Sequence, residues 1–153
     1  MISMRSKYAL KALGYMARTS DKESFLIADI AQAENIPKKF LEAILLTLKN
    51  NGILSSRKGP GGGYSLAKAP AALTIGAIVR SFEGDLAPVQ CLVEATHSAC
   101  PECIDEETCG IKLVMADVSQ AISSVLDTVT LADMLQRSEF ERQKRQQVVD
   151  FAI

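Results

Sequence analysis

The chain has 153 residues, 48% of them hydrophobic, so it is long enough to bury one core with an appended helical extension. Its 17 Lys and Arg residues are balanced by 18 Asp and Glu residues, and any contact with DNA must therefore come from local basic clusters. Charged residues interrupt the N-terminal segment and no apolar run reaches membrane-spanning length, which predicts a soluble, cytoplasmic protein without a signal peptide or a membrane partner.

Three helices are predicted in the first third of the chain. Apolar residues at three- and four-residue steps predict an amphipathic helix over 6–19 and a short one over 26–34. Pro37 suits the first position of a third helix, which should end at Asn50. The apolar stripe expected on this third helix consists of Phe40, Leu41, Ile44, Leu45 and Leu48.

A hairpin is predicted directly after the third helix. Two short strands, over 53–56 and 64–66, flank a glycine-rich loop over 57–63 whose glycines permit backbone angles closed to other residues. The loop matches neither of the common nucleotide-phosphate motifs, and it joins two strands instead of leading from a strand into a helix. Three helices followed by a hairpin predict a winged helix-turn-helix.

The second half of the chain is predicted to be helical around an irregular segment that carries the cysteines. Thr74 is a plausible N-cap for a helix over 73–82. Helical spacing of apolar residues then predicts a long amphipathic helix over about 106–127. Thr130 and Asp133 resemble a capping box for a last short helix that ends at Gln136.

These elements predict a mainly α fold with a small β wing and a long dimerisation helix. The polar composition after Gln136 favours a loosely ordered C-terminal segment. We expect a winged helix-turn-helix domain over 1–84, a cysteine-bearing sensor loop over 85–105, a dimerisation helix and a short helix over 106–137, and a flexible tail over 138–153.

The third helix carries the residue types that read DNA. In a helix-turn-helix the second helix of the motif lies in the major groove, and its first turns reach base edges and phosphates. Lys38 and Lys39 can neutralise phosphates or donate to guanine, and Glu42 can accept from the cytosine amino group. Ala43 completes this candidate reading face.

The glycine loop offers a second candidate DNA contact. Arg57 and Lys58 precede Gly59, Gly61 and Gly62, so cations stand beside backbone that has no side chains. This arrangement lets a cation enter a minor groove and lets amides approach phosphate. The plainer alternative is a solvated helix face and a flexible hairpin, but both features would then have to match a winged helix by chance.

Four sequence strings carry a resemblance to a known family: Tyr8-Ala9-Leu10, Phe40-Leu41-Glu42, Gly52-Ile53-Leu54 and the wing string from Arg57 to Tyr64. They resemble the bacterial Rrf2 family of transcription regulators, which includes IscR, NsrR and CymR, over the chain from Met4 to about Gln136. The resemblance implies a homodimeric repressor or activator that binds a palindromic operator in double-stranded DNA. It also implies that the long helix crosses its partner from the second subunit.

The resemblance further implies which residues contact DNA. The family's minor-groove cation falls on Lys58, and Ala43 stands where IscR has a glutamine, so the same operator sequence is not expected. The complete set of expected DNA-binding residues is Lys38, Lys39, Phe40, Glu42, Ala43, Arg57, Lys58, Gly59, Gly61, Gly62 and Tyr64.

Four cysteines lie within nineteen residues: Cys91, Cys100, Cys103 and Cys109. In a reducing cytosol such clustering favours metal binding or redox chemistry over structural disulfides. The C-x2-C pair formed by Cys100 and Cys103 does not by itself distinguish an iron–sulfur cluster from zinc. A metal-free thiol switch and four inert cysteines are the remaining alternatives.

The resemblance favours an iron–sulfur cluster among these alternatives. Some family members hold a cluster through three cysteines, which resemble Cys91, Cys103 and Cys109. Their fourth ligands, a histidine in IscR and an acidic residue in NsrR, are replaced here by Lys112 and Lys7. Cys100, ahead of His97, would complete an all-cysteine site of the type that holds [2Fe–2S] or [4Fe–4S] clusters.

An enzyme that uses these cysteines is the weaker interpretation. A thiol oxidoreductase would place its C-x2-C pair after a strand in a βαβ unit, and this pair has no such setting. The chain has one histidine and no evident nucleophile–base pair. The sequence therefore predicts a regulator without enzymatic activity or a small-molecule substrate.

Overall fold

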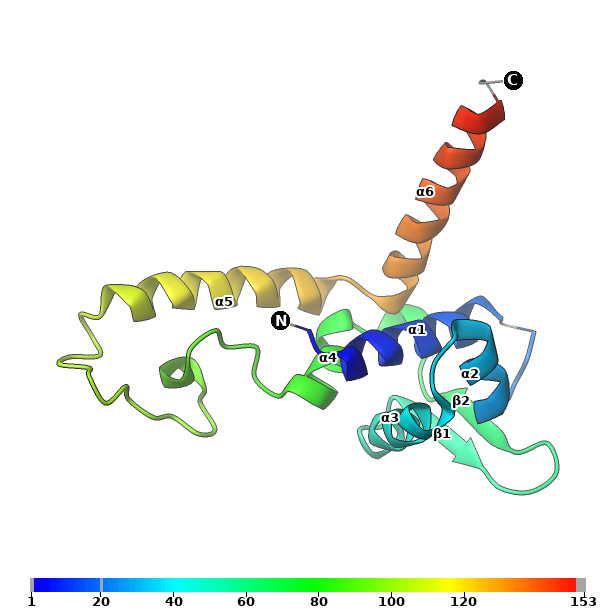
Figure 1. The fold of residues 1–153 in the computed structure, drawn as a ribbon, viewed down its shortest axis with the longest axis horizontal. Helices are drawn as coiled ribbons and strands as arrows, with labels where there is room; N and C mark the ends of the chain where they lie inside the picture. The colour runs from blue at the N-terminus through cyan, green and yellow to red at the C-terminus, as the bar shows by residue number, and fades with distance from the viewer. Residues whose placement is uncertain (1, 20, 151–153) are drawn as a thin grey trace.

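The computed structural model describes residues 2–19 and 21–150, and side chains as far as residue 147. The fold is mainly α with one small antiparallel sheet, as predicted (Figure 1). Its elements are α1 (Met4–Arg18), α2 (Ile27–Glu34), α3 (Lys38–Asn50), β1 (Leu54–Arg57), β2 (Gly63–Leu66), η1 (Pro70–Ala72), α4 (Ile75–Glu83), η2 (Gln90–Leu92), α5 (Gly110–Thr128) and α6 (Leu131–Asp150).

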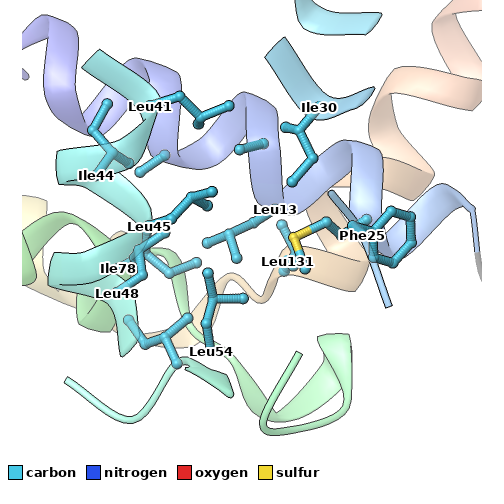
Figure 2. Packing of buried hydrophobic residues seen from close by; sticks show 14 of the residues in the cluster. Leu13, Phe25, Ile30, Leu41, Ile44, Leu45, Leu48, Leu54, Ile78 and Leu131 are labelled. Atoms are coloured by element: carbon cyan, nitrogen blue, oxygen red, sulfur yellow. The ribbon is translucent and has the colours of Figure 1, made fainter. Parts of the chain in front are cut away.

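One hydrophobic core joins α1 to α4 and the first residue of α6. Leu13 of α1 is fully buried among leucine and isoleucine side chains that converge from α3 and α4 (Figure 2). Tyr15 and Phe25 close one side with an edge-to-face contact at 5.8 Å between ring centroids. The core fixes α3, because Leu41, Ile44, Leu45 and Leu48 form its buried stripe.

The third helix differs from its prediction at two positions. Pro37 is the N-cap residue and Lys38 is the first helical residue. Phe40 does not belong to the buried stripe, since 53% of the residue is exposed. The reason is angular: successive residues on an α-helix are about 100° apart, so Phe40 lies at the edge of the face that Leu41 directs inward.

The hairpin is anchored to the helical core at its root. Leu54 pairs with Leu66 and Arg57 pairs with Gly63 in the antiparallel register. The backbones of Phe25 and Tyr64 exchange two hydrogen bonds, with N···O distances of 2.8 and 2.9 Å. The hairpin therefore projects from the domain as a wing. Its base is held by the strand pairing and by the hydrogen bonds to Phe25.

The remaining helices are attached by caps and one ion pair. The side chain of Thr74 accepts a hydrogen bond from the amide of Ala77, as expected of the N-cap of α4. Arg80 of α4 forms a two-pronged ion pair with Asp127 of α5, and one of its distances is 3.0 Å between Nη2 and Oδ2. This pair fastens α5 to the winged-helix domain.

Two predicted boundaries were wrong. The long helix begins at Gly110 and not at Glu106, because the Asp105 carboxylate accepts from the Glu107 amide and the Thr108 hydroxyl and holds a local turn. The flexible tail expected from residue 138 is helical as far as Asp150, and 151–153 lie outside the described residues. Strong helix formers and close charge pairs explain this, since Glu139 pairs with Arg142 three residues on.

Among the described residues, none of the helices is long and apolar enough to cross a membrane. Figure 1 shows α5 and α6 leaving the winged-helix domain in different directions. The chain between α4 and α5 lies alongside α5 and contains only the short η2. All four cysteines lie in this connection.

Candidate nucleic-acid interface and cysteine segment

The start of α3 presents a polar face to solvent. Lys38, Lys39, Glu42 and Ala43 are all exposed, while the opposite side of the helix is locked into the core. A helix held in this way presents its exposed face in a fixed orientation relative to the domain. The structure thus brings together the residues predicted to read a major groove.

The wing presents cations on a glycine-rich tip. Arg57 and Lys58 are exposed, and the amide of Gly62 donates to the carbonyl of Gly59 at 2.8 Å to close the turn. Gly59 and Gly61 have φ values of 91° and 72°, a region that side chains disfavour. The glycines at these positions are required by the turn as well as by any close approach to a ligand.

Tyr64 has a structural role in the wing. Its side chain packs partly against the core, and its backbone pairs with Phe25. It therefore anchors the hairpin that carries the exposed cations. The contact of Tyr64 with DNA stays a prediction beside this structural role.

A depression beside α3 was not anticipated from the sequence. We name it the Arg5 hollow: it has a volume of about 350 Å³ and lies where the start of α1, the exposed side of α3 and the end of α4 meet. It is lined by Arg5, Lys39, Phe40, Ala43, Ile44, Thr47 and Phe82.

The cysteine segment, residues 85–109, brings three of its thiols near one another. The Cys103 amide donates to the Cys100 carbonyl at 3.0 Å, so the C-x2-C pair forms a tight turn. Desolvation raises the pKa of the Cys103 thiol, and the neighbouring charges of Cys109, Cys100 and Glu106 raise it further. Cys109 is the N-cap residue of α5.

The four thiols of this segment are suitable ligands for a metal ion or an iron–sulfur cluster. They are not arranged around a common centre in this structure. Cys91, Cys103 and Cys109 are half-buried and Cys100 is exposed. Within the described part of the chain, no three His, Cys, Asp or Glu side chains are placed so that they could hold one metal ion. Closing four thiols around a metal or cluster would therefore require the segment to rearrange.

The alternative ligand His97 and the cation Lys112 both contact the same acidic residue. Glu106 Oε2 lies 2.8 Å from Lys112 Nζ and 3.0 Å from His97 Nε2. The hydrogen bond with Glu106 raises the pKa of Lys112, and the nearby charges of Cys91 and Cys103 act in the same direction. Lys112 is consequently a cation at neutral pH beside the cysteines.

The long helix exposes an apolar stripe along its length. Ile111, Val114, Val118, Ile122 and Val125 are 38–70% exposed and recur at three-, four- and seven-residue intervals. Along the second half of α5, a hollow of about 810 Å³ lies between this stripe and the start of the cysteine segment. The segment contributes Leu86, Ala87 and Pro88 to that hollow.

Comparisons with known proteins agree on one class. A family model described as Rrf2, iron-dependent transcriptional regulator, matches residues 2–137. An rrf2-like HTH-type transcriptional regulator of Rhodobacter capsulatus is 41% identical, over 88% of this chain and 92% of its own. The HTH-type transcriptional regulator NsrR of Geobacillus kaustophilus is 35% identical over 86% of each chain.

Solved structures lead to the same class. The structure of CymR, the global cysteine regulator of B. subtilis, superposes with a TM-score of 0.73 at 28% identity, and the match covers 90% of this chain and 97% of that one. IscR of T. potens gives a TM-score of 0.71 at 28% identity, covering 90% of this chain and 88% of that one. These neighbours confirm the winged-helix fold.

Proposed function

The chain belongs to the Rrf2 family of transcriptional regulators, which are not enzymes, and from this premise we propose that it reads operator DNA as a homodimer and senses its signal through the cysteine segment. The α3 face would enter the major groove, and the wing would reach the adjacent minor groove. The observation that supports this most directly is the pairing of an exposed, rigidly held α3 face with a cationic glycine wing.

In this proposal some residues contact bases and others contact the phosphate backbone. Glu42 accepts a hydrogen bond from a cytosine amino group, while Lys38 and Lys39 serve guanine or phosphate. Lys58 enters the minor groove and Arg57 holds the neighbouring phosphate. Ala43 has no hydrogen-bonding group in its side chain, so base reading by this helix depends on its neighbours.

Homodimerisation is supported by the exposed stripe of α5. An apolar face of this length is unusual on a monomer's surface and is covered most simply by the same face of a second copy. Two copies would then present two α3 helices to a palindromic site, with half-sites separated by whole turns of DNA.

Selection from a random-sequence duplex pool tests the DNA-reading proposal. We expect an enriched palindrome, a footprint with two-fold symmetry, and tight binding that is lost when the palindrome is scrambled. Glu42→Ala should keep general affinity and relax preference at one position per half-site by about 1–3 kcal/mol. A pool that shows no enrichment would refute sequence-specific binding.

For the cysteine segment we propose an iron–sulfur cluster held by Cys91, Cys100, Cys103 and Cys109. A bound cluster would supply a group that responds to iron, oxidants or nitric oxide. The four residues would draw the segment together beside the start of α5, since Cys109 directly precedes that helix. Lys112 would offset the negative charge of four thiolates.

Metal analysis after anaerobic purification tests this assignment. Stoichiometric iron and sulfide, lost in Cys103→Ala, would support the cluster, and Ser98→Ala provides a control on the same segment. Stoichiometric zinc without sulfide would indicate a zinc site instead of an iron–sulfur cluster. A metal-free protein whose DNA binding follows a reversible disulfide would favour the thiol switch.

A further inference from the structure

The Arg5 hollow contains two cations contributed by different elements. Arg5 lies in the first turn of α1, and Lys39 lies in the first turn of α3. Both residues are exposed, and within the part of the chain that the structure describes neither makes an ion pair. Two carboxylates stand close to these elements, Glu42 on α3 and Glu83 at the end of α4, and neither lines the hollow. The Glu83 carboxylate accepts hydrogen bonds from Ser3 and Ser6.

Much of the lining of the hollow is apolar. Phe40, Ala43 and Phe82 line it together with the two cations. Phe40 is 53% exposed, which is a large aromatic surface to leave facing water beside a charged rim. A ligand that combines a negative charge with a flat or weakly polar body matches such a lining, and a sugar–phosphate unit of a nucleic acid has this chemistry.

The position of the hollow relative to α3 identifies its side of the DNA. In Figure 1, α3 lies between the wing on one side and the beginning of α1 with α4 on the other. A helix in a major groove about 12 Å wide has a phosphate strand on each flank. With α3 in the groove, the wing with Arg57 and Lys58 would face one flank, and the Arg5 hollow, on the α1 and α4 side of α3, would face the other.

We propose that the Arg5 hollow is a backbone-binding subsite in which Arg5 and Lys39 together hold one DNA phosphate. This inference rests on the proposed DNA-reading function and adds to it a positioning residue, Arg5, outside the helix-turn-helix and the wing. The planar guanidinium can donate two parallel hydrogen bonds to phosphate oxygens, and Lys39 adds a point charge. The contact fixes the angle of α3 in the groove without reading a base.

The salt dependence of binding to a random-sequence 30-base-pair duplex tests this subsite. Each neutralised phosphate adds about 0.9 to the slope of log affinity against log salt. Arg5→Gln should therefore lower the slope by as much as about 0.9 and weaken binding by as much as about eightfold at 0.1 M salt, these being the values for complete loss of one phosphate contact. Arg5→Lys should restore most of the slope, because it keeps the charge while losing the paired donors.

Lys7→Gln is the matched control. Lys7 is an exposed cation two residues further along α1, about 200° around the helix from Arg5, and it does not line the hollow. The same loss of charge there should leave the slope unchanged. Equal slopes for Arg5→Gln and the unchanged protein, or equal losses for Arg5→Gln and Lys7→Gln, would overturn the subsite.

A double substitution tests whether the two cations share one phosphate. Arg5→Gln and Lys39→Gln combined should weaken binding by less than the product of their separate effects, since both remove the same contact. Multiplicative effects would refute a shared phosphate. Failure of the unchanged protein to select any operator would instead count against the proposed function, so the two failures are distinguishable.

Discussion

At Gly63 the wing and the core approach each other closely. It has a φ of 142°, and a Cβ placed there would lie 2.5 Å from the Phe25 carbonyl oxygen and 2.7 Å from Ser24 Oγ. The two backbone hydrogen bonds between Phe25 and Tyr64 require this approach. The glycine therefore couples the position of the wing to the body of the domain.

Replacing Gly63 by alanine should loosen the root of the wing. We expect the free energy of unfolding to fall by about 1–3 kcal/mol, because strain and a backbone clash act together. Affinity for a selected operator should fall as well. Urea denaturation gives the first quantity and fluorescence anisotropy the second.

Gly59→Ala separates the effect of backbone strain from the effect of the backbone clash. Gly59 also has a positive φ, of 91°, but a Cβ there would meet nothing within 4 Å. Its substitution should therefore cost less stability than Gly63→Ala. Equal losses at the two positions would contradict the role assigned to the close approach of the wing.

Glu83 makes the stability of the domain depend on pH. Its carboxylate accepts from the Ser3 amide at 3.0 Å and from the buried Ser6 hydroxyl at 2.5 Å. These hydrogen bonds, with those of Ser3 the larger influence, lower the pKa of Glu83. Because the folded-state pKa is depressed, this stabilisation is complete above the unfolded value, near 4.3, and is lost as pH falls through the lower folded value.

Unfolding measured between pH 6 and pH 3 should show this dependence. Glu83→Gln should flatten the curve of unfolding free energy against pH, since the amide oxygen still accepts a hydrogen bond but does not titrate. Glu23→Gln, at an exposed carboxylate, is the control. Curves of equal steepness for Glu83→Gln and the unchanged protein would show that Glu83 does not contribute.

Some functional residues could be predicted from the sequence and others could not. The exposure of Lys38, Lys39 and Glu42 followed from helical periodicity, because the buried stripe of α3 determines which side remains in solvent. No pattern in the sequence pointed to Arg5 as a candidate DNA contact. Its relevance arises from the packing of α1, α3 and α4 around one hollow, and a periodic pattern within one segment carries no information about that packing.

At the scale of elements, α6 begins at a reciprocal cap. The Thr130 hydroxyl donates to Asp133 Oδ2 at 2.7 Å, and the Asp133 amide donates back to the Thr130 oxygen at 3.1 Å. The hydrogen bonds to Thr130 lower the pKa of Asp133, so the cap is charged at neutral pH. The first residue of the helix, Leu131, is fully buried in the core.

Thr130→Ala should weaken the start of α6. We expect a loss of about 1 kcal/mol in unfolding free energy, the usual effect of removing an N-cap hydroxyl, with some loss of helical circular dichroism. Thr128→Ala is the matched control, because the Thr128 hydroxyl bonds only to carbonyls within α5. A larger effect at Thr128 than at Thr130 would contradict the cap.

The helix boundaries show what local sequence could determine. The capping residues Thr74 and Thr130 were identified correctly, since a cap depends on neighbours within a few residues. The start of α5 was placed too early because Asp105 diverts the chain into a turn that apolar spacing does not reveal. The helix beyond Gln136 was missed because the prediction weighed polarity above helix propensity.

At the scale of the whole molecule, α5 connects the cysteine segment to the winged-helix domain. Cys109 caps one end of the helix, and near the other end Asp127 binds Arg80 of α4. Gly76 permits this contact, since a Cβ there would lie 3.1 Å from the Leu126 carbonyl and would displace Asp127. A rearrangement around Cys109 would thus act about 27 Å away along a stiff helix.

The cysteine site itself was the least predictable part of the molecule. Four thiols within one segment indicated a metal or redox function, because that conclusion needs only composition and spacing. Which thiols meet depends on the fold of a segment with little regular structure, and Cys100 remains exposed apart from the half-buried three. Spacing alone therefore predicted the class of site and not the arrangement of its thiols.

We expect the exposed stripe of α5 to join two copies of the chain. Val118 lies in the middle of the exposed α5 stripe and lines the hollow formed with the cysteine segment. Val118→Glu would place a charge in the interface that each copy repeats, so two unpaired carboxylates would be desolvated together. We expect a dimer by light scattering for the unchanged protein and a monomer for Val118→Glu at micromolar concentration.

Gln120→Glu provides the control for that experiment, because residue 120 is exposed and lies about 200° around α5 from Val118. It adds the same charge away from the stripe and should leave the dimer intact. Monomeric Val118→Glu should also lose operator affinity while keeping the helical circular dichroism of its domain, because each half-site alone is bound weakly. An unchanged protein that is already monomeric, yet binds a palindrome with full affinity, would show that DNA and not α5 brings the two copies together.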